Sequence, residues 1–316
     1  MKKKILITGG LGFIGNKLIK KISKKYKIFI LDNFYTSSSK NIKGAKVIKC
    51  DLTNYKSLKK IKISNIDSVV HLAGQSSGPK SFNMPEFDLK LNLISTINII
   101  NFCKKNKIKK IIFSSTFAVY GDVKNKEKIS ENEKCDPKSF YAISKYASEK
   151  YLVQLCNKYK INWNILRFFN VYGPGQDLSR TDQGIVSIFL DLIRNNNKIK
   201  VNGSLKRFRD LVYIDDVINS IVLTMKNKKY TNKIYNVGTG KKTTVRELIK
   251  KISKLYNKDK ILKVSISNST PGDILGCYAD LKKIKKDLNY TPLTNLTKGL
   301  ELFKHWAENN YYIKKK

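Results

Sequence analysis

The sequence is poor in the residues that build metal and disulfide sites. Its 316 residues include two histidines, His71 and His305, and five cysteines without a Cys-x-x-Cys spacing. An odd set of cysteines gives no disulfide framework, and two histidines are too few for a zinc site. We therefore expect no metal site, a structural role for His71 at the end of a strand, and a surface position for His305.

Long apolar runs and a secretory leader are also missing. No apolar stretch approaches the ~18 residues that a membrane span requires. The opening Met1-Lys2-Lys3-Lys4 leads into a short apolar strand and a glycine cluster without a small-residue cleavage site, unlike a signal peptide. Because 41% of the residues are hydrophobic, a disordered chain is excluded. We expect a cytoplasmic protein without membrane contact.

Arginine is scarce in a chain that is otherwise strongly basic. Lys and Arg total 63 against 24 Asp and Glu, for a formal net charge of +39, yet only six of the 63 are arginine. The lysines are spread through every segment together with many Ile and Asn residues. A nucleic-acid footprint would concentrate basic residues on one face, whereas a bias toward AT-rich codons would scatter lysine in this way. We favour the codon bias and expect no nucleic-acid partner.

Apolar runs and helical patterns alternate through the first half of the chain. This alternation predicts an α/β fold with a doubly wound parallel sheet of the Rossmann type, with helices on both faces. The expected strands are residues 4–8, 27–31, 46–50, 67–72, 108–114 and 162–168, and the expected helices are residues 13–25, 91–105 and 137–159.

The alternation loosens after Gly173-Pro174-Gly175, where shorter elements follow. We expect residues 1–170 to form a cofactor-binding domain. Residues 171–316 are expected to form a smaller α/β lobe over the carboxyl edge of the sheet, with the chain crossing between the two parts.

Three glycines mark the first strand-to-helix junction. Gly9, Gly12 and Gly15 permit a tight turn, close approach of the backbone to a pyrophosphate, and close packing of the helix on the strand. Asp32 ends the second strand, where its carboxylate can accept hydrogen bonds from ribose hydroxyls and would repel a 2′-phosphate. This pattern favours NAD over NADP. Asp51, after the third strand, is placed either to reach the adenine or to cap the helix that follows Thr53.

A tyrosine four residues before a lysine on one helix face can supply a tyrosinate base. That spacing occurs eight times in this chain, so position must select among the pairs. Tyr141 and Lys145 open the helix that follows the fifth strand, whose end carries Ser114-Ser115-Thr116 at the edge where ligands bind in such folds. Tyr146 lies about 140° further around the same helix and is expected to point elsewhere.

Several motifs, taken in order, resemble a known superfamily. The glycine loop, His71-Leu72-Ala73-Gly74, the run from Ser114 to Gly121 and Tyr141-x-x-x-Lys145 resemble the extended short-chain dehydrogenases/reductases. The run from Arg167 to Pro174 and the run from Arg209 to Asp216 are similar to the nucleotide-sugar branch, the NAD-dependent epimerase/dehydratase family. Within that branch the chain most resembles the UDP-glucose 4-epimerase group.

The resemblance implies a UDP-linked sugar substrate, NAD as cofactor, and a homodimer formed through residues 91–105 and 137–159. Tyr141 would act as base and acid at the sugar 4-hydroxyl, with Thr116 bound to the same oxygen, and Lys145 would hold the nicotinamide ribose and lower the pKa of Tyr141. A 4-keto sugar would form, rotate about its diphosphate link and be reduced on its opposite face. The further cofactor contacts implied are Phe13, Ile14, Asn33, Leu52, Leu72, Ala73, Gly74, Asn92, Ser114 and Phe168. Asn92 matches an asparagine of the family's long helix, which implies that it fixes the active-site backbone.

The residues after Thr116 separate reaction types within this family. Sugar-nucleotide 4,6-dehydratases carry Asp-Glu at the two positions where this chain has Phe117 and Ala118. Epimerisation is therefore favoured. The alternatives are another reductase, dehydratase or epimerase of the same family, and a nucleotide-binding protein without catalysis, against which the intact Thr116, Tyr141 and Lys145 argue.

Five of the six arginines lie between Arg167 and Arg209. Because the planar guanidinium binds phosphate bidentately in a way that lysine cannot, we expect Arg209 first and Arg207 second to bind the substrate diphosphate. For Arg167 a structural ion pair is an equal alternative, and Arg180 and Arg194 are expected at the surface.

Three more positions bear on the substrate. Asn170 is expected to bind the diphosphate or the sugar. Thr270 stands where the family usually carries an arginine, two residues before Gly272-Asp273. Cys277 matches the position beside the sugar 2-substituent, where a small residue would admit an N-acetyl group; an ordinary buried cysteine is the alternative.

Overall fold

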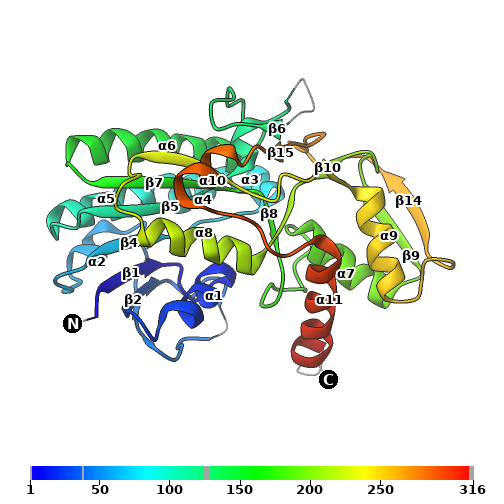
Figure 1. Cartoon of the computed structure of the whole chain (residues 1–316), viewed down its shortest axis with the longest axis horizontal. Coiled ribbons are helices and arrows are strands. Elements are labelled where there is room, and N and C mark those ends of the chain that lie inside the picture. The colour runs from blue at the N-terminus through cyan, green and yellow to red at the C-terminus, as the bar shows by residue number, and fades with distance from the viewer. Residues whose placement is uncertain (1, 38, 124–127, 313–316) are drawn as a thin grey trace.

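The apolar runs of the sequence become adjacent strands of one parallel sheet. A computed structural model describes residues 2–37, 39–123 and 128–312 (Figure 1). Every neighbouring pair in the seven-stranded sheet is parallel, so the predicted doubly wound α/β fold is confirmed. In sheet order the strands are β12 (Lys233–Val237), β7 (Asn162–Phe168), β5 (Lys110–Thr116), β4 (Ser68–His71), β1 (Lys4–Thr8), β2 (Lys27–Asp32) and β3 (Ala45–Lys49).

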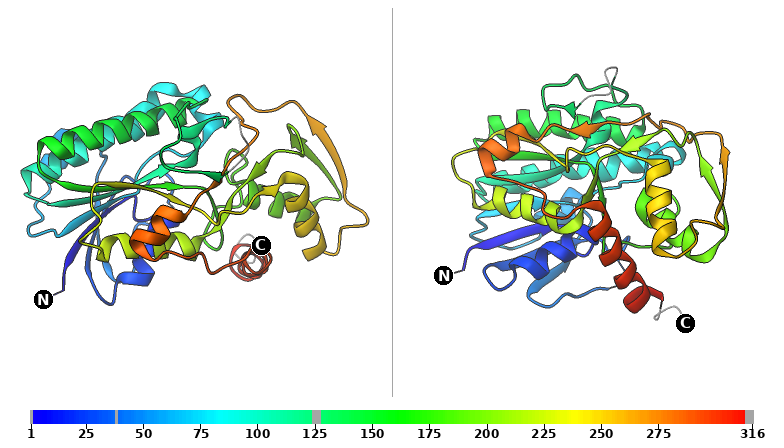
Figure 2. Two further views of the ribbon diagram at one scale, coloured as in Figure 1. Left: turned by 45° about the horizontal axis from the view of Figure 1, so that its top comes forward. Right: turned by 45° about the vertical axis from the view of Figure 1, so that its right-hand side comes forward.

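The central strands are apolar on both sides because helices cover both faces of the sheet. In β1, Ile5 and Ile7 pack on one side and Leu6 packs on the other. Figure 2 shows the two helical layers on either side of the sheet. One layer holds α1 (Phe13–Ile22) and α8 (Ile214–Lys226), and the other holds α2 (Tyr55–Lys59), α5 (Ser95–Lys105) and α6 (Phe140–Lys158).

Several predicted boundaries shift because local capping and backbone geometry decide them. The helix predicted from residue 137 begins at Phe140, since the Ser139 side chain accepts a hydrogen bond from the Ala142 amide at 3.2 Å. The first helix ends at Ile22, three residues early. Lys107, with φ of 55°, separates α5 from the fifth strand, which starts at residue 110 instead of 108.

The long helix predicted at residues 91–105 starts earlier and changes its winding. It consists of α4 (Pro85–Leu89), a π-helical turn η1 (Lys90–Ile94) and α5. π-helical turns occur frequently at functional sites. Here the turn carries Asn92, which is buried beneath the strand ends.

The remaining elements form the second part of the molecule and its connections. Four of them are grouped on one side in Figure 1, namely α7 (Ile185–Asn195), β9 (Lys198–Asn202), α9 (Val245–Leu255) and β14 (Lys263–Ser267). In α9, Thr244 and Glu247 form a capping box. The paired strands are β8 (Asn170–Tyr172) with β11 (Leu211–Tyr213), β9 (Lys198–Asn202) with β14 (Lys263–Ser267), β10 (Phe208–Arg209) with β13 (Thr243–Thr244), and β6 (Lys128–Ile129) with β15 (Tyr278–Ala279). The helices are α3 (Gly78–Asn83), η2 (Phe117–Tyr120), α7 (Ile185–Asn195), α9 (Val245–Leu255), α10 (Lys282–Leu288), α11 (Leu296–Trp306) and η3 (Ala307–Tyr312).

The chain returns to the sheet after entering this second part. Helix α8 and strand β12 both follow residue 171, yet they pack against and extend the main sheet. The division of the chain at residue 171 stays a prediction, and these two elements lie on the sheet side of it.

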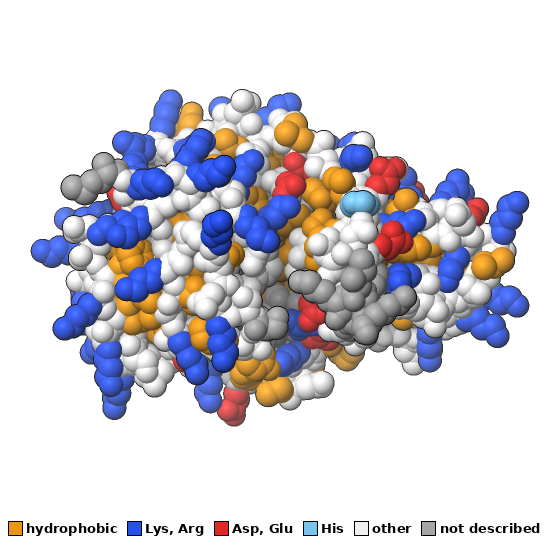
Figure 3. Space-filling model, turned by 90° about the horizontal axis from the view of Figure 1, so that it is seen from below, with side chains coloured by type: hydrophobic (Ala, Val, Ile, Leu, Met, Phe, Trp, Pro, Cys, Tyr) orange, Lys and Arg blue, Asp and Glu red, His pale blue; other side chains and the backbone are white. Residues whose placement is uncertain are grey.

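The basic side chains are scattered over the surface in view. Figure 3 shows Lys and Arg side chains distributed over one whole face, with apolar and uncharged areas between them. Within the described ranges, none of the helices combines the length and apolar character needed to cross a membrane. The same residues contain no group of three or more His, Cys, Asp or Glu side chains that could hold a metal ion.

Candidate active site

One cavity of about 800 Å³ lies at the carboxyl ends of the sheet strands and extends to the second part of the molecule. Most residues predicted from the sequence line it, although they are distributed over more than half of the chain. The predicted residues in its wall are Gly9, Gly12, Phe13, Ile14, Gly15, Asp32, Asn33, Asp51, Leu52, Leu72, Ala73, Gly74, Ser114, Thr116, Tyr141, Lys145, Phe168, Asn170, Arg207 and Arg209.

The glycine loop is packed so closely that side chains are excluded from it. Gly9 has φ of +66°, and a Cβ atom there would lie 2.7 Å from the Ala73 nitrogen. A Cβ atom on Gly15 would lie 2.5 Å from the Gly9 oxygen and 2.6 Å from Gly10 Cα. Gly12 precedes α1 without a side chain to cap it, so the amides of the first turn remain available to an anion.

The Gly15→Ala substitution tests this packing. We expect it to lower the free energy of unfolding by about 1–3 kcal/mol, because the new methyl group meets backbone atoms that cannot move aside. Dinucleotide affinity should fall with it. Urea unfolding and fluorescence titration with NAD would measure the two effects. Gly78→Ala is the matched control, since a Cβ atom there has no neighbour within 4 Å in the described chain; equal losses in both variants would contradict the packing argument.

Two carboxylates stand beside this loop. Asp32 accepts hydrogen bonds from the Leu11 amide at 3.0 Å and the Phe34 amide at 2.9 Å, which joins the end of β2 to the glycine loop. Asp51 is exposed and accepts from the amide and hydroxyl of Thr53 at 2.9 and 2.8 Å. The helix that follows Thr53 is capped by Asn54 and not by Asp51.

Thr116, Tyr141 and Lys145 meet where β5 ends and α6 begins. Tyr141 is hydrogen-bonded to the Thr116 side chain. The Lys145 side chain is 5% exposed, and its Nζ lies 4.1 Å from the centroid of the Phe113 ring. A Cβ atom on Gly74 would lie 4.0 Å from the same nitrogen, so the ammonium is beside the loop that follows β4.

The electrostatics of this group differ from the expectation that Lys145 lowers the pKa of Tyr141. Burial raises the pKa of Tyr141 to about 12, the hydrogen bond with Thr116 opposes this rise, and the charge of Asp88 adds to it. Burial lowers the pKa of Lys145 to about 7, against the charges of Glu149 and Asp88. Desolvation of the phenol therefore decides the direction of its shift.

Both histidines lie outside this chemistry. His71 is fully buried, with Nδ1 2.6 Å from Thr8 Oγ1 and Nε2 3.1 Å from Thr96 Oγ1, and burial lowers its pKa to about 3. His305 is exposed on α11.

Two of the predicted site residues do not line the cavity. Asn92 is 1% exposed, and its Oδ1 accepts a hydrogen bond from the Gln75 amide at 3.1 Å, so its contact is with the active-site backbone. Cys277 is also 1% exposed and is not among the wall residues. Its place beside the sugar 2-substituent stays a prediction.

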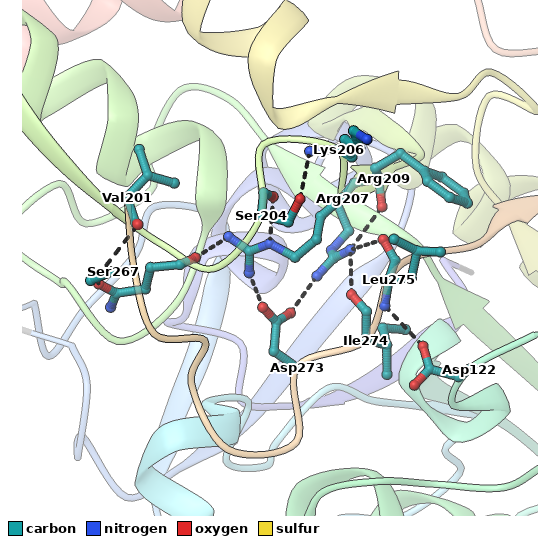
Figure 4. A network of polar contacts seen from close by, with 12 residues as sticks. Asp122, Val201, Ser204, Lys206, Arg207, Arg209, Ser267, Asp273, Ile274 and Leu275 are labelled. Carbon is teal, nitrogen blue, oxygen red and sulfur yellow. Dashed lines mark hydrogen bonds and ion pairs between the residues drawn. The ribbon is translucent and has the colours of Figure 1, made fainter. Parts of the chain in front are cut away.

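Arg207 and Arg209 converge on one carboxylate at the far end of the cavity (Figure 4). Arg209 donates to Asp273 Oδ1 at 2.7 Å and to the Ile274 oxygen at 3.2 Å. Arg207 is paired with the other oxygen of Asp273. Two guanidinium groups against one carboxylate leave one excess positive charge, and burial together with Arg207 lowers the pKa of Arg209 to about 10.

The other clustered arginines divide into two kinds. Arg167 forms a buried bidentate pair with Glu149, with nitrogen-oxygen distances of 3.0 and 2.7 Å, so the structural alternative holds for it. Arg180 pairs with Asp182 and lines the cavity, contrary to the expected surface position. Arg194, on α7, is not in the wall.

Two amide side chains in the wall carry buried oxygens that lack a hydrogen-bond partner among the described residues, Asn170 Oδ1 and Gln176 Oε1. Asn170 was predicted as a ligand residue, whereas Gln176 was missed, although it directly follows the Gly173-Pro174-Gly175 break. Gln75, Gln183 and Asp273 are further wall residues that the sequence did not indicate. Isolated amides and carboxylates carry no spacing signal.

Comparisons with known proteins agree on the family. The sequence pattern of the NAD dependent epimerase/dehydratase family matches residues 5–238. A Methanocaldococcus jannaschii protein named as a proposed UDP-glucose 4-epimerase is 34% identical over 97% of this chain and 99% of its own. The UDP-glucose 4-epimerase of Thermotoga maritima, solved with UDP-glucose, has a TM-score of 0.91 at 31% identity over 96% of this chain and 98% of its own. The UDP-N-acetylglucosamine 4-epimerase of Methanobrevibacter ruminantium, solved with UDP-N-acetylmuramic acid, has a TM-score of 0.87 at 29% identity over 100% of both chains.

The wall residues fit a dinucleotide. The cradle at Gly9 and Gly15 admits only backbone, the uncapped start of α1 faces it, and Asp32 provides a carboxylate at the end of β2. Lys145 and Tyr141 line the same cavity.

Proposed function

Because the chain belongs to the NAD-dependent epimerase/dehydratase family, with NAD as its cofactor, we propose that it is a nucleotide-sugar 4-epimerase that works through a transient 4-keto sugar. The wall beside Thr116 carries this proposal. Phe117 and Ala118 line the cavity at the positions where a dehydratase needs an acid and a base. The Phe117 ring stacks on Phe169 with centroids 5.4 Å apart, which leaves an apolar surface there. Elimination of water has no proton donor at this position, whereas Tyr141 is in place for the 4-hydroxyl.

The chain's own groups then divide the work. In its phenolate form Tyr141 takes the proton of the sugar 4-hydroxyl and returns it from the same oxygen, and Thr116, hydrogen-bonded to Tyr141, holds the substrate oxygen in line. NAD, when bound, would supply the hydride acceptor and donor for C4 of the sugar. Lys145 holds the nicotinamide ribose from its buried position beside Gly74.

The diphosphate of the substrate is assigned to the two arginines that meet at Asp273. Arg207 takes the place of the phosphate ligand that is missing at Thr270, and Arg209 provides the second guanidinium. Asn170 and Gln176 offer their unpartnered oxygens to hydroxyl groups of the sugar or ribose. We propose UDP-glucose and UDP-galactose as the substrate pair, with the N-acetylhexosamine forms as a further possibility for the same site.

The Arg209→Lys substitution tests the diphosphate assignment. We expect KM for the nucleotide sugar to rise about 10- to 100-fold, because lysine keeps the charge and loses the planar fork. Steady-state kinetics would measure it. Arg246→Lys is the control, since Arg246 is exposed on α9 and outside the cavity. An unchanged KM in Arg209→Lys would remove this residue from the site.

The proposed activity is tested with a panel of UDP-, GDP-, CDP- and dTDP-sugars. Product analysis by NMR is expected to show inversion at C4 of a UDP-hexose without accumulation of NADH. A 4-keto-6-deoxy product would establish the dehydratase reaction instead, and a stoichiometric change in NADH would establish a reductase or dehydrogenase.

We also propose a cytoplasmic homodimer. Apolar side chains that are 43–51% exposed lie on α6, one of the two segments through which the family resemblance implies pairing, and at the end of α4, directly before the other segment at residues 91–105. A patch of this kind is typical of a subunit interface. Its members are Leu89, Phe140, Ile143 and Tyr151.

A further inference from the structure

A buried carboxylate that the proposed chemistry does not use lies directly behind the active site. Asp88, on α4, is 1% exposed. Its oxygens accept three hydrogen bonds, from Gln75 Nε2 at 2.7 Å, Asn92 Nδ2 at 3.1 Å and Ser144 Oγ at 2.5 Å. All three partners donate, which is the pattern that an ionised carboxylate requires. Burial raises the pKa of Asp88, and the hydrogen bonds from Ser144, Gln75 and Asn92 oppose that rise.

The three partners of Asp88 all belong to segments that build the site. Gln75 lines the cavity next to Gly74. Ser144 directly precedes Lys145 on α6, and its hydroxyl is also 3.0 Å from the Tyr141 carbonyl oxygen. Asn92 lies in the π-helical turn and donates to Ser144 Oγ at 3.1 Å. Asp88 therefore joins the loop after β4 to the first turn of the catalytic helix.

Among the buried groups around Lys145, Asp88 is the carboxylate that is not already paired with another cation. Glu149, one turn further along α6, is already paired through both oxygens with Arg167 from β7. His71 from β4 is held neutral by burial, and β5 contributes the uncharged Phe113 ring. In the described part of the chain, no carboxylate is within the 4.0 Å ion-pair distance of Lys145 Nζ. An unbalanced buried ammonium would be costly.

We propose that Asp88 is a positioning residue of the reaction, which supplies negative charge that favours the cationic form of Lys145 and, through Ser144 and Asn92, fixes the helix turn that carries Tyr141 and Lys145. It touches neither substrate nor cofactor. The inference rests on the proposed roles of Tyr141 and Lys145 and names a residue that supports them from behind.

The direction of the pKa shifts agrees with this role. The charge of Asp88 raises the pKa of Lys145 and also raises the pKa of Tyr141. Removing that charge lowers both pKa values. The acidic limb of a pH–rate profile reports the group that must lose a proton and the alkaline limb the group that must keep one. Both limbs should therefore move to lower pH together.

Asp88→Asn is the variant that isolates the charge. Its Oδ1 can accept from Gln75 and Asn92, and its Nδ2 can donate to Ser144 Oγ, which still reaches the Tyr141 carbonyl oxygen. We expect both limbs of the kcat profile to move to lower pH by about one unit, the order of magnitude for the loss of one nearby unit charge in a protein interior. Ser144→Ala is the comparison, because it keeps the carboxyl group and removes one hydrogen bond that favours its ionised form; its limbs should move less than those of Asp88→Asn.

A second measurement needs no sugar turnover. Calorimetric titration of the full-length chain with NAD near pH 7, in two buffers of different ionisation enthalpy, counts the protons taken up on binding. Asp88→Asn should take up more protons than the native protein, because its Lys145 must be protonated as the complex forms. If the native protein binds NAD but inverts no sugar, the proposed function fails while this comparison still decides the role of Asp88. If Asp88→Asn folds normally, leaves both limbs of the pH–rate profile in place and takes up as many protons as the native protein, the proposed role of Asp88 is overturned.

Discussion

Replacing Tyr141 with Phe is expected to lower kcat about 10²- to 10⁴-fold, the range that a positioned acid–base group contributes. The phenol is the proton acceptor and donor of the proposed reaction, and its removal leaves only Thr116 beside the substrate oxygen. The ring itself remains, so the fold and NAD affinity should be preserved. Initial rates of C4 inversion, together with a fluorescence titration of NAD, would separate the two effects.

Tyr146→Phe is the matched control for this substitution. Tyr146 is on the same helix and also precedes a lysine by four residues, with Lys150 Nζ 4.9 Å from its ring centroid. It does not line the cavity. Its loss should leave kcat unchanged. A large loss in Tyr146→Phe, or a nearly native rate in Tyr141→Phe, would show that the wrong pair was assigned.

Replacing Arg167 with Met is expected to lower the free energy of unfolding by about 3–5 kcal/mol, because it leaves Glu149 ionised, buried and unpaired. The two side chains are only 3% and 2% exposed, and Ser115 Oγ donates to the same carboxylate at 2.5 Å. Urea unfolding at neutral pH would measure the loss.

The double variant Arg167→Met with Glu149→Leu distinguishes a lost attraction from a stranded charge. Replacing both partners with apolar groups removes the desolvation cost along with the attraction, so most of the stability should return. A double variant as unstable as the single one would contradict this explanation. A single variant that loses less than about 1 kcal/mol would resemble an exposed pair and would also contradict it.

Local patterns in the sequence were sufficient for six of the seven strands of the sheet and for the start of the cofactor site. The apolar runs of β1, β2 and β7 are short-range signals, and the glycine loop gains its meaning from its place between a strand and a helix. The carboxyl ends of parallel strands meet at one edge, so Asp32 and Thr116 could be placed near a common site before any contact was known.

Long-range contacts account for what the sequence did not reveal. The pairing of Arg207 and Arg209 with Asp273 joins residues more than sixty positions apart, and neither arginine signals this partner by its spacing. The return of α8 and β12 to the sheet is likewise a property of the packed chain. The upward shift of the Tyr141 pKa follows from burial, which motif spacing does not describe.

The scarcity of arginine in the composition helped to predict site residues. In a chain that uses lysine almost everywhere, the rare arginines marked positions with geometric demands. Arg180, Arg207 and Arg209 line the cavity, while Arg167 meets a different demand, a bidentate pair in the protein interior. The clustering of arginine thus predicted bidentate guanidinium contacts. It did not show whether each guanidinium binds a substrate or a carboxylate of the protein itself.

The central claim is that hydride leaves and returns to the same carbon of a nucleotide sugar within one active site. A UDP-hexose deuterated at C4 tests it directly. We predict that the C4 epimer forms with the deuterium retained at C4, and that no deuterium enters C4 when unlabelled substrate reacts in D₂O. Loss of the label to solvent, or label from D₂O appearing at C4 of the epimer, would contradict the account.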